Sequence, residues 1–107
     1  MANTFINKGA ALVTGGTDVD TCPGATAAIV NAIYVSNIDG TNSADVNIKA
    51  TIDGGSTYMH IAKTVPVPAD STLVLEKPVN LAAADKIHFT ASANSDLECF
   101  LSILEIT

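Results

Sequence analysis

The stretch Ala44-Asp45-Val46-Asn47-Ile48-Lys49-Ala50-Thr51-Ile52 decides the fold class. Every second residue from Ala44 to Ile52 is apolar, and the residues between them are polar. Alternate side chains of a β-strand point to opposite faces, so this period of two predicts a half-buried strand. Residues 86–91 alternate in the same way, and residues 72–76 do so less cleanly. The pattern therefore predicts an all-β protein.

Turn residues separate these strands. Asp53-Gly54-Gly55-Ser56 follows the first stretch, Asp39-Gly40-Thr41-Asn42 precedes it, and Asn94-Ser95-Asp96 lies before the last apolar run. Glycine adopts positive φ without a Cβ clash, which favours a tight hairpin after Ile52. Residues 81–84 are expected to form a loop or one turn of 3₁₀ helix because they are too few to nucleate an α-helix. About eight strands are predicted, at residues 10–13, 18–21, 26–37, 45–52, 57–65, 72–76, 86–93 and 97–105.

This number and spacing of strands favours an antiparallel β-sandwich of jelly-roll or immunoglobulin-like topology. The chain has 107 residues, which is enough for one domain with a single core. We expect residues 9–107 to form that domain. Residues 1–8 are expected to be either a first edge strand or an arm that docks on another protein, and the sequence leaves both open.

The composition excludes several classes of protein. Hydrophobic residues make up 48% of the chain, so intrinsic disorder is not expected. The net charge is -6, and the five cations are scattered lysines, which disfavours direct binding to nucleic acid or to an anionic membrane. No signal peptide or membrane span is expected, and the chain is expected to be made in a cytoplasm with Cys22 and Cys99 reduced. A disulfide between these two cysteines remains an alternative.

Two predicted strands are apolar on both faces, although a sandwich core covers only one. The first carries Ile29, Ile33 and Val35 in alternation with Val30, Ala32 and Tyr34, and the last carries Leu97, Cys99, Leu101 and Ile103 in alternation with Phe100, Leu104 and Ile106. The second face is either shielded by loops or meets another subunit. The candidate interface residues are Phe5, Ile6, Phe100, Leu104 and Ile106.

No motif predicts catalysis, a metal site or a cofactor. His60 and His88 have no partner at metal-ligand spacing. Asp18 and Asp20, two residues apart, are expected on one face of a solvated strand edge rather than in a calcium or acid–base site. The glycine pair Gly15-Gly16 lacks the lysine and the helix of a phosphate-binding loop. The chain is therefore expected not to be an enzyme.

Several strand ends and turns resemble those of small β-sandwich virion proteins of tailed bacteriophages, particularly cyanophages. The resemblance runs from about Thr21 to the C-terminus. It includes Cys22-Pro23-Gly24-Ala25-Thr26 before an apolar strand, Val35-Ser36-Asn37, Asp53-Gly54-Gly55-Ser56-Thr57-Tyr58, the segment 65–72, the segment 84–93 and the closing strand 101–106. These are structural features rather than a catalytic signature.

The resemblance implies a structural protein of the virion, assembled in the host cytoplasm. A capsid cement or decoration protein is the favoured role, with the major capsid protein or other virion proteins as partners and a homo-oligomer as the expected state. A neck, tail or fibre component is the alternative within the particle. A non-catalytic carbohydrate-binding module is the alternative outside it, and it would require Tyr34 or Tyr58 to form an exposed aromatic platform.

Overall fold

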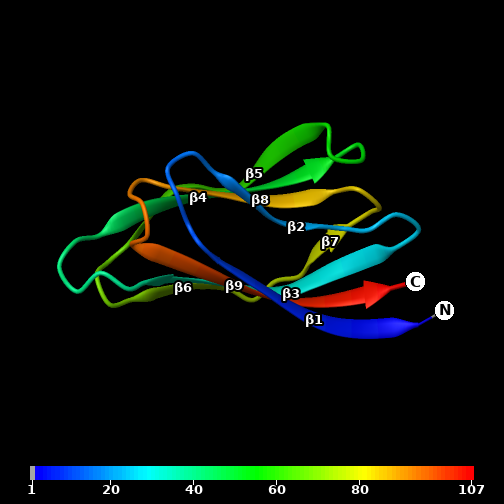
Figure 1. Cartoon of the computed structure of the whole chain (residues 1–107), viewed down its shortest axis with the longest axis horizontal. Helices are drawn as coiled ribbons and strands as arrows, with labels where there is room; N and C mark the ends of the chain where they lie inside the picture. Colours follow the sequence, from blue (N-terminus) through cyan, green and yellow to red (C-terminus); the bar gives the residue numbers. More distant parts are fainter. Residues whose placement is uncertain (1) are drawn as a thin grey trace.

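The computed structural model describes residues 2–107 as two antiparallel β-sheets packed face to face (Figure 1). We call them sheet A and sheet B. Sheet A has the strand order β1-β9-β3-β6, and β7 also pairs with β3; sheet B has the order β2-β8-β4-β5. The strands are β1 (Asn3–Ala11), β2 (Thr17–Thr21), β3 (Ala27–Asn37), β4 (Ala44–Ile52), β5 (Thr57–Val67), β6 (Thr72–Leu75), β7 (Val79–Leu81), β8 (Lys86–Ala91) and β9 (Leu97–Ile106). The predicted all-β sandwich is confirmed.

The connections identify the topology as a jelly roll. The strands β6 and β7 pair with opposite halves of β3, so they are two pieces of one strand, interrupted around Pro78. Proline cannot donate a ladder hydrogen bond, which explains a break there. Counted this way, each sheet has four strands in the order of two interleaved Greek keys. An immunoglobulin-like sandwich would place its first two strands in the same sheet, whereas β1 and β2 lie in different sheets.

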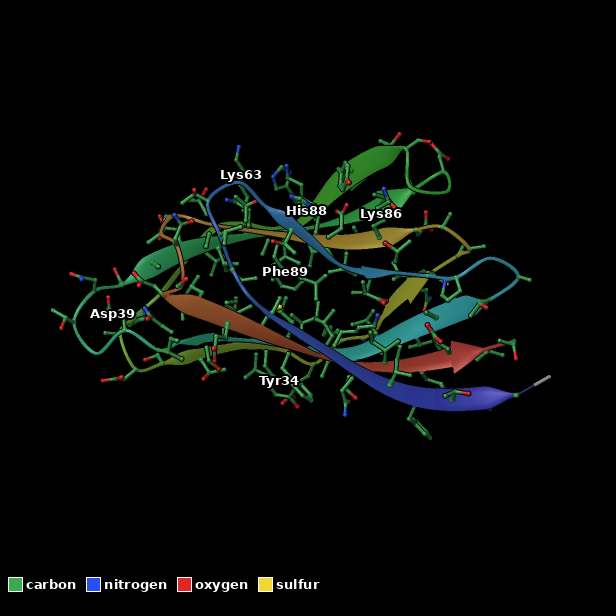
Figure 2. All side chains as sticks on the ribbon, viewed as in Figure 1. Tyr34, Asp39, Lys63, Lys86, His88 and Phe89 are labelled. Atoms are coloured by element: carbon green, nitrogen blue, oxygen red, sulfur yellow. The ribbon has the colours of Figure 1, made fainter. Side chains whose placement is uncertain are left out.

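The core lies between the sheets and follows the predicted alternation of the 44–52 stretch as far as Ile48; at the end of that stretch Thr51 is buried and Ile52 is 49% exposed, the reverse of the prediction. In β4 the inward residues Ala44, Val46 and Ile48 are buried, and in β9 the inward residues run from Leu97 to Ile103. Phe89 of β8 is fully buried near the middle of the sandwich, where Figure 2 shows it between the two layers. Period-two burial therefore accounts for which face of these strands turns inward.

Two β-bulges reverse the faces that simple alternation predicts. In β3 the register shifts between Val30 and Ala32, so Val30 and Ile33 are both buried while Ile29 lies on the outside. In β2 the register shifts between Asp18 and Asp20. The prediction that Asp18 and Asp20 share a solvated face is wrong, because Asp20 is only 2% exposed. One extra residue in a bulge turns every later side chain over.

Both cysteines are free and buried. Cys22 follows β2 and its Sγ donates to the carbonyl oxygen of Thr26 at 3.3 Å, while Cys99 points inward from β9. Burial raises the pKa of both thiols above the usual value. A raised pKa keeps a thiol protonated and slow to react. Residues 2–107 contain no helix of the length and apolarity needed to span a membrane.

Candidate docking surface

The outward side of sheet A carries two rows of apolar side chains, which are separated by Asn7 and Ser102. The strand register places Phe5 of β1 beside Leu104 of β9, and Leu104 beside Ile29 of β3. A second row runs from Phe100 of β9 through Tyr34 of β3 to Val74 of β6. We call these residues the apolar outer face; they are Phe5, Ile29, Tyr34, Val74, Phe100 and Leu104.

Much of the apolar outer face is open to solvent. Phe5 is 79% exposed, Phe100 is 46% exposed and Tyr34 is 38% exposed. The rings of Tyr34 and Phe100 pack in a tilted pair with centroids 6.1 Å apart. Figure 2 shows Tyr34 pointing away from the sandwich, on the side opposite Lys63 and His88. Contiguous exposed apolar surface on a soluble domain marks an interaction site more often than a solvated face.

The structure brings together four of the five interface residues proposed from sequence. Phe5, Phe100, Leu104 and Ile106 all point outward from β1 and β9. Ile6 pairs with the buried Ile103 and packs against the core instead. Sequence reasoning omitted Ile29, Tyr34 and Val74, although the two apolar sides of residues 26–37 signalled the first two. Val74 is brought to this face by the pairing of β6 with β3, which no local pattern encodes.

A groove opens at the edge of the sandwich where β5 of sheet B lies near the broken strand β6–β7 of sheet A. Its volume is about 530 Å³. The lining is mainly apolar, with two charged residues, and comprises Ile61, Val74, Leu75, Glu76, Lys77, Pro78 and Val79. Ile61, which lines it, ends a run of exposed residues in β5 that begins at Thr57. The groove is thus continuous with an edge strand whose outer side has no strand partner in residues 2–107.

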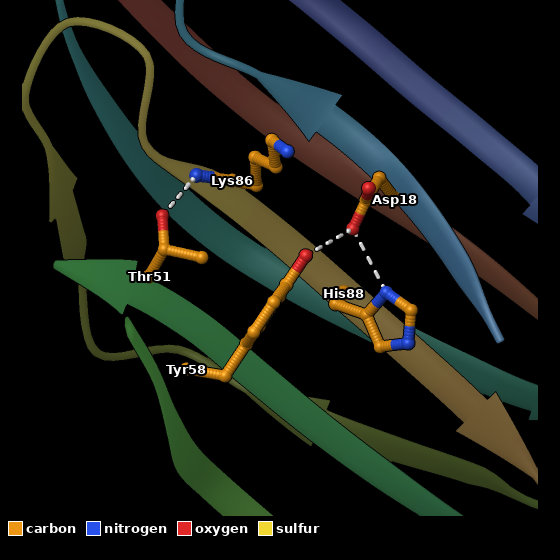
Figure 3. Close-up of polar contacts among 5 residues, drawn as sticks. All are labelled: Asp18, Thr51, Tyr58, Lys86 and His88. Carbon is orange, nitrogen blue, oxygen red and sulfur yellow. Dashed lines mark hydrogen bonds and ion pairs between the residues drawn. The ribbon is translucent and has the colours of Figure 1, made fainter. Parts of the chain in front are cut away.

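The outward side of sheet B carries a polar cluster, drawn in Figure 3. Oδ1 of Asp18 lies 2.8 Å from Nδ1 of His88 and accepts a hydrogen bond from the Tyr58 hydroxyl at 3.2 Å. The rings of Tyr58 and His88 meet edge to face, with centroids 5.4 Å apart. The three side chains come from β2, β8 and β5. Strands β2 and β8 are neighbours in sheet B, whereas β4 lies between β8 and β5, so Tyr58 reaches the pair across one strand. Sequence reasoning treated these residues singly and missed it.

The geometry of this cluster favours structure over catalysis. An aspartate–histidine pair can act as a general base when the free ring nitrogen faces a substrate. Here a Cβ atom on Gly16 would lie 2.5 Å from Nε2 of His88, so the backbone covers that nitrogen. The Tyr58 hydroxyl points at Asp18 rather than into open space. Within residues 2–107, no group of three or more His, Cys, Asp or Glu residues is arranged to hold a metal ion.

Comparisons with known proteins identify the fold. No protein-family model matches the chain, and no curated protein matches it. A solved structure of disulfide-linked pili from Bacillus endospore appendages is similar, with a TM-score of 0.60, 14% identity, and coverage of 99% of this chain and 87% of that chain. An acid-stable capsid structure of the Helicobacter pylori bacteriophage KHP30 is similar with a TM-score of 0.58, 7% identity, and coverage of 100% and 89%. At these identities the likeness establishes a shared architecture.

Proposed function

We propose that this chain is a structural protein of a bacteriophage particle and that it works by contact with other proteins. The observation that carries the proposal is the apolar outer face of sheet A, where Phe5, Tyr34 and Phe100 remain exposed in the isolated chain. The architecture shared with a phage capsid structure supports it. Jelly rolls occur in viral capsids and in other classes, so the surface has to carry the functional argument.

Within the particle, we propose a capsid cement or decoration role. A protein that binds the assembled lattice and not its separated subunits stabilises the lattice by mass action. The apolar outer face would supply the contact with the major capsid protein. Charged residues form only 15% of the chain, so little ionic desolvation would oppose packing of this domain among neighbours. A neck, tail or fibre position uses the same kind of contact and differs in copy number.

A carbohydrate-binding module receives less support. Such a module would stack sugar rings on an exposed aromatic platform, and the chain has two tyrosines and no tryptophan. Tyr34 lies on the outer side of sheet A and Tyr58 on that of sheet B, so the two cannot form one platform. The Tyr58 hydroxyl is also committed to Asp18.

The test is to measure the copy number and position of this chain in purified particles of the phage that encodes it. Quantitative mass spectrometry would give the number, and cryo-electron microscopy the position. Hundreds of copies in register with the capsid lattice, with sheet A facing the lattice, are expected. A few copies at one vertex would replace the cement role with a neck or tail role. Absence from the particles would overturn the structural role.

A further inference from the structure

We propose that two copies of this chain pair along their β1 strands, antiparallel and about a twofold axis at Asn7, so that sheet A continues across the dimer. This goes beyond the particle role, because it specifies how copies meet one another. The pairing uses the backbone of β1 and leaves the apolar outer faces of both copies on one side. Its test requires only the purified chain, so it succeeds or fails independently of the particle role.

The outer edge of β1 is the one sheet edge in residues 2–107 that lacks protection against pairing with another strand. Proteins protect such edges with bulges, prolines, charges or short strands. Strand β2 has a bulge and two aspartates, β5 has register shifts and Pro66, and β6 and β7 are short strands on either side of Pro78. Strand β1, at the lower border of Figure 1, pairs with β9 over nine residues without a register shift or a proline. Its one charged residue, Lys8, lies against Asp20 of the same chain.

The hydrogen bonds at the ends of β1 show which backbone groups face this edge. In an antiparallel pair, opposite residues alternate between those that exchange two hydrogen bonds and those that exchange none. Ala2 and Thr107 exchange two bonds, at 3.2 and 2.9 Å. The Leu12 nitrogen donates to the Leu97 oxygen at 2.8 Å. Even-numbered residues of β1 therefore bond to β9. The odd-numbered residues direct their N–H and C=O groups to the open edge, and these residues are Asn3, Phe5, Asn7, Gly9 and Ala11.

A second copy of β1 is complementary to this edge along its whole length. Asn7 is the central residue of the nine in β1, so two antiparallel copies centred there overlap completely. Each odd-numbered residue then lies opposite an odd-numbered residue of the other copy, and all of the free N–H and C=O groups are paired. Any other register leaves some of them unpaired. The opposed pairs are Asn7 with Asn7, Phe5 with Gly9, and Asn3 with Ala11.

The side chains also fit in this register. Phe5 is 79% exposed, and the residue opposite it is a glycine, so its ring can lie across the backbone of the other copy. Aromatic side chains stabilise strand pairs in this way by covering an edge glycine. Gly9 lies beside Phe100 of its own chain, so the partner's ring would extend the apolar outer face across the axis. On the other face, Lys8 lies opposite Ile6 and not opposite a second lysine.

Charge favours β1 as the place where two copies meet. The chain carries a net charge of -6, so most contacts between copies are repulsive. Strand β1 contains no acidic residue, and the register centred on Asn7 places no like charges directly opposite each other. A contact between two identical edges is isologous and occupies the unprotected edge of both copies. Association is therefore expected to stop at a dimer.

Sedimentation velocity and amide hydrogen exchange on the purified chain test the pairing. The wild type is expected to form dimers. As its concentration rises, exchange should slow at the amides of Phe5, Asn7 and Gly9, whereas the amides of Ile6 and Lys8 already bond to β9 and should not change. Slowing at the even-numbered residues alone would overturn the proposal, because those amides face away from the open edge.

Substitutions at the axis test its position. Asn7→Pro removes the donors of the two central bonds but no bond to β9, and should weaken dimers about tenfold or more. Asn7→Lys and Asn7→Asp each place two like charges face to face, and each should weaken dimers about fivefold. An equal mixture of these two charged variants should dimerise at least as strongly as the wild type. Asn3→Lys, the matched control, adds a charge opposite Ala11 and should leave dimers unchanged.

Circular dichroism melting checks that each variant folds, and the exchange pattern of the wild type does not depend on any variant. Dimers that persist unchanged in Asn7→Pro would overturn the proposal. A mixture no stronger than either charged variant alone would also overturn it, because the axis would then lie elsewhere. A monomeric wild type would overturn it too and would leave the edge of β1 to a strand of another protein. If that monomer were still found in particles, the particle role would stand.

Discussion

The Lys8 ammonium of β1 lies 3.8 Å from Oδ1 of Asp20 in β2, which links the two sheets at one edge of the sandwich. The Asp20 side chain is 1% exposed and the Lys8 side chain is 47% exposed. Neither carboxylate oxygen of Asp20 has a hydrogen-bond partner in residues 2–107. Burial raises the pKa of Asp20 above its ordinary value of 3.8, and the Lys8 charge opposes that rise. The link therefore holds a carboxylate in a site that disfavours its charge.

This raised pKa makes stability depend on pH. The unfolded chain releases the Asp20 proton at lower pH than the folded chain, so it binds fewer protons between the two pKa values. The contribution of Asp20 to the free energy of unfolding is then fully present below the ordinary value of 3.8 and is lost as pH rises through the folded pKa. Urea unfolding at several pH values should show this fall in the difference between the wild type and Asp20→Asn.

Lys8→Met provides a second check on the same pair. It removes the opposing charge, so the pKa of Asp20 should rise further and the chain should lose about 1–3 kcal/mol at neutral pH. This loss is smaller than the one expected on breaking a fully buried ion pair, because the Lys8 side chain is half exposed. Equal pH profiles for the wild type and Asp20→Asn would contradict the assignment to Asp20.

Gly16 is predicted to be intolerant of any side chain. Its φ is +88°, and an added Cβ would meet the His88 ring at 2.5 Å. Gly16→Ala should strain the turn, displace His88 from Asp18 and cost about 1–3 kcal/mol. Thermal unfolding measures the loss. Gly15→Ala is the matched control, because nothing lies within 4 Å of a Cβ there, and an equal loss in both variants would contradict this explanation.

Asp85 is predicted to be a structural carboxylate of the hairpin end. It is 6% exposed, and it accepts hydrogen bonds from the Thr51 hydroxyl and from the backbone nitrogens of Gly55 and Ala82. Asp85→Ala would leave these donors without their partner and should cost about 2–4 kcal/mol in chemical denaturation. Asp53→Asn, at the exposed tip of the same hairpin, should be nearly neutral because asparagine tolerates positive φ.

Phe100 is predicted to contribute to docking on the particle. Its side chain is 46% exposed at the centre of the apolar outer face, so Phe100→Asp should fold normally. A charge that has to be desolvated at the contact should weaken particle binding about tenfold or more. Binding to particles that lack the protein measures the effect. Thr21→Asp adds the same charge beside Lys86 on sheet B, and equal loss in both would contradict a role for sheet A.

Removing residues 2–8 is predicted to destabilise the isolated chain. Most of the pairing of β1 with β9 lies in this segment, and Ile6 packs against the core. Its loss would expose the edge of β9 and lower the melting temperature by several degrees. An unchanged melting temperature with weaker particle binding would instead indicate a docking arm. Phe5→Ala in the intact chain separates the contribution of the Phe5 side chain to particle binding from that of the strand.

Strand existence and inward faces were predictable wherever alternation is unbroken, as from Ala44 to Ile48. The bulges at residues 19 and 31 were not, because each turns the following side chains over without a local signal in sequence. This is why Asp20 was expected in solvent and lies buried. The strand Val79–Leu81 was also missed, since three residues beside Pro78 carry too little pattern.

The docking surface was predictable only in part. The last strand has apolar residues on both of its faces, and the core covers only one face. This pattern identified Phe100 and Leu104 as apolar residues that lie outside the core. The neighbours that complete the surface, such as Val74, depend on which strands pair, and pairing between distant segments is set by the whole fold. The Asp18–Tyr58–His88 cluster has the same origin, because its members are up to 70 residues apart.

The central place of β9 in sheet A has a consequence for how the chain acquires its structure. β9 follows every other strand in the sequence, yet it is the sole strand partner of β1 and covers one whole side of β3. Sheet A therefore cannot close until the ribosome has made residues 97–106, and the first strand has to wait for the last. Loop closure over nearly the full chain length makes folding slow. Nascent chains that stall before Leu97 would expose unpaired strand edges and depend on chaperones to avoid aggregation.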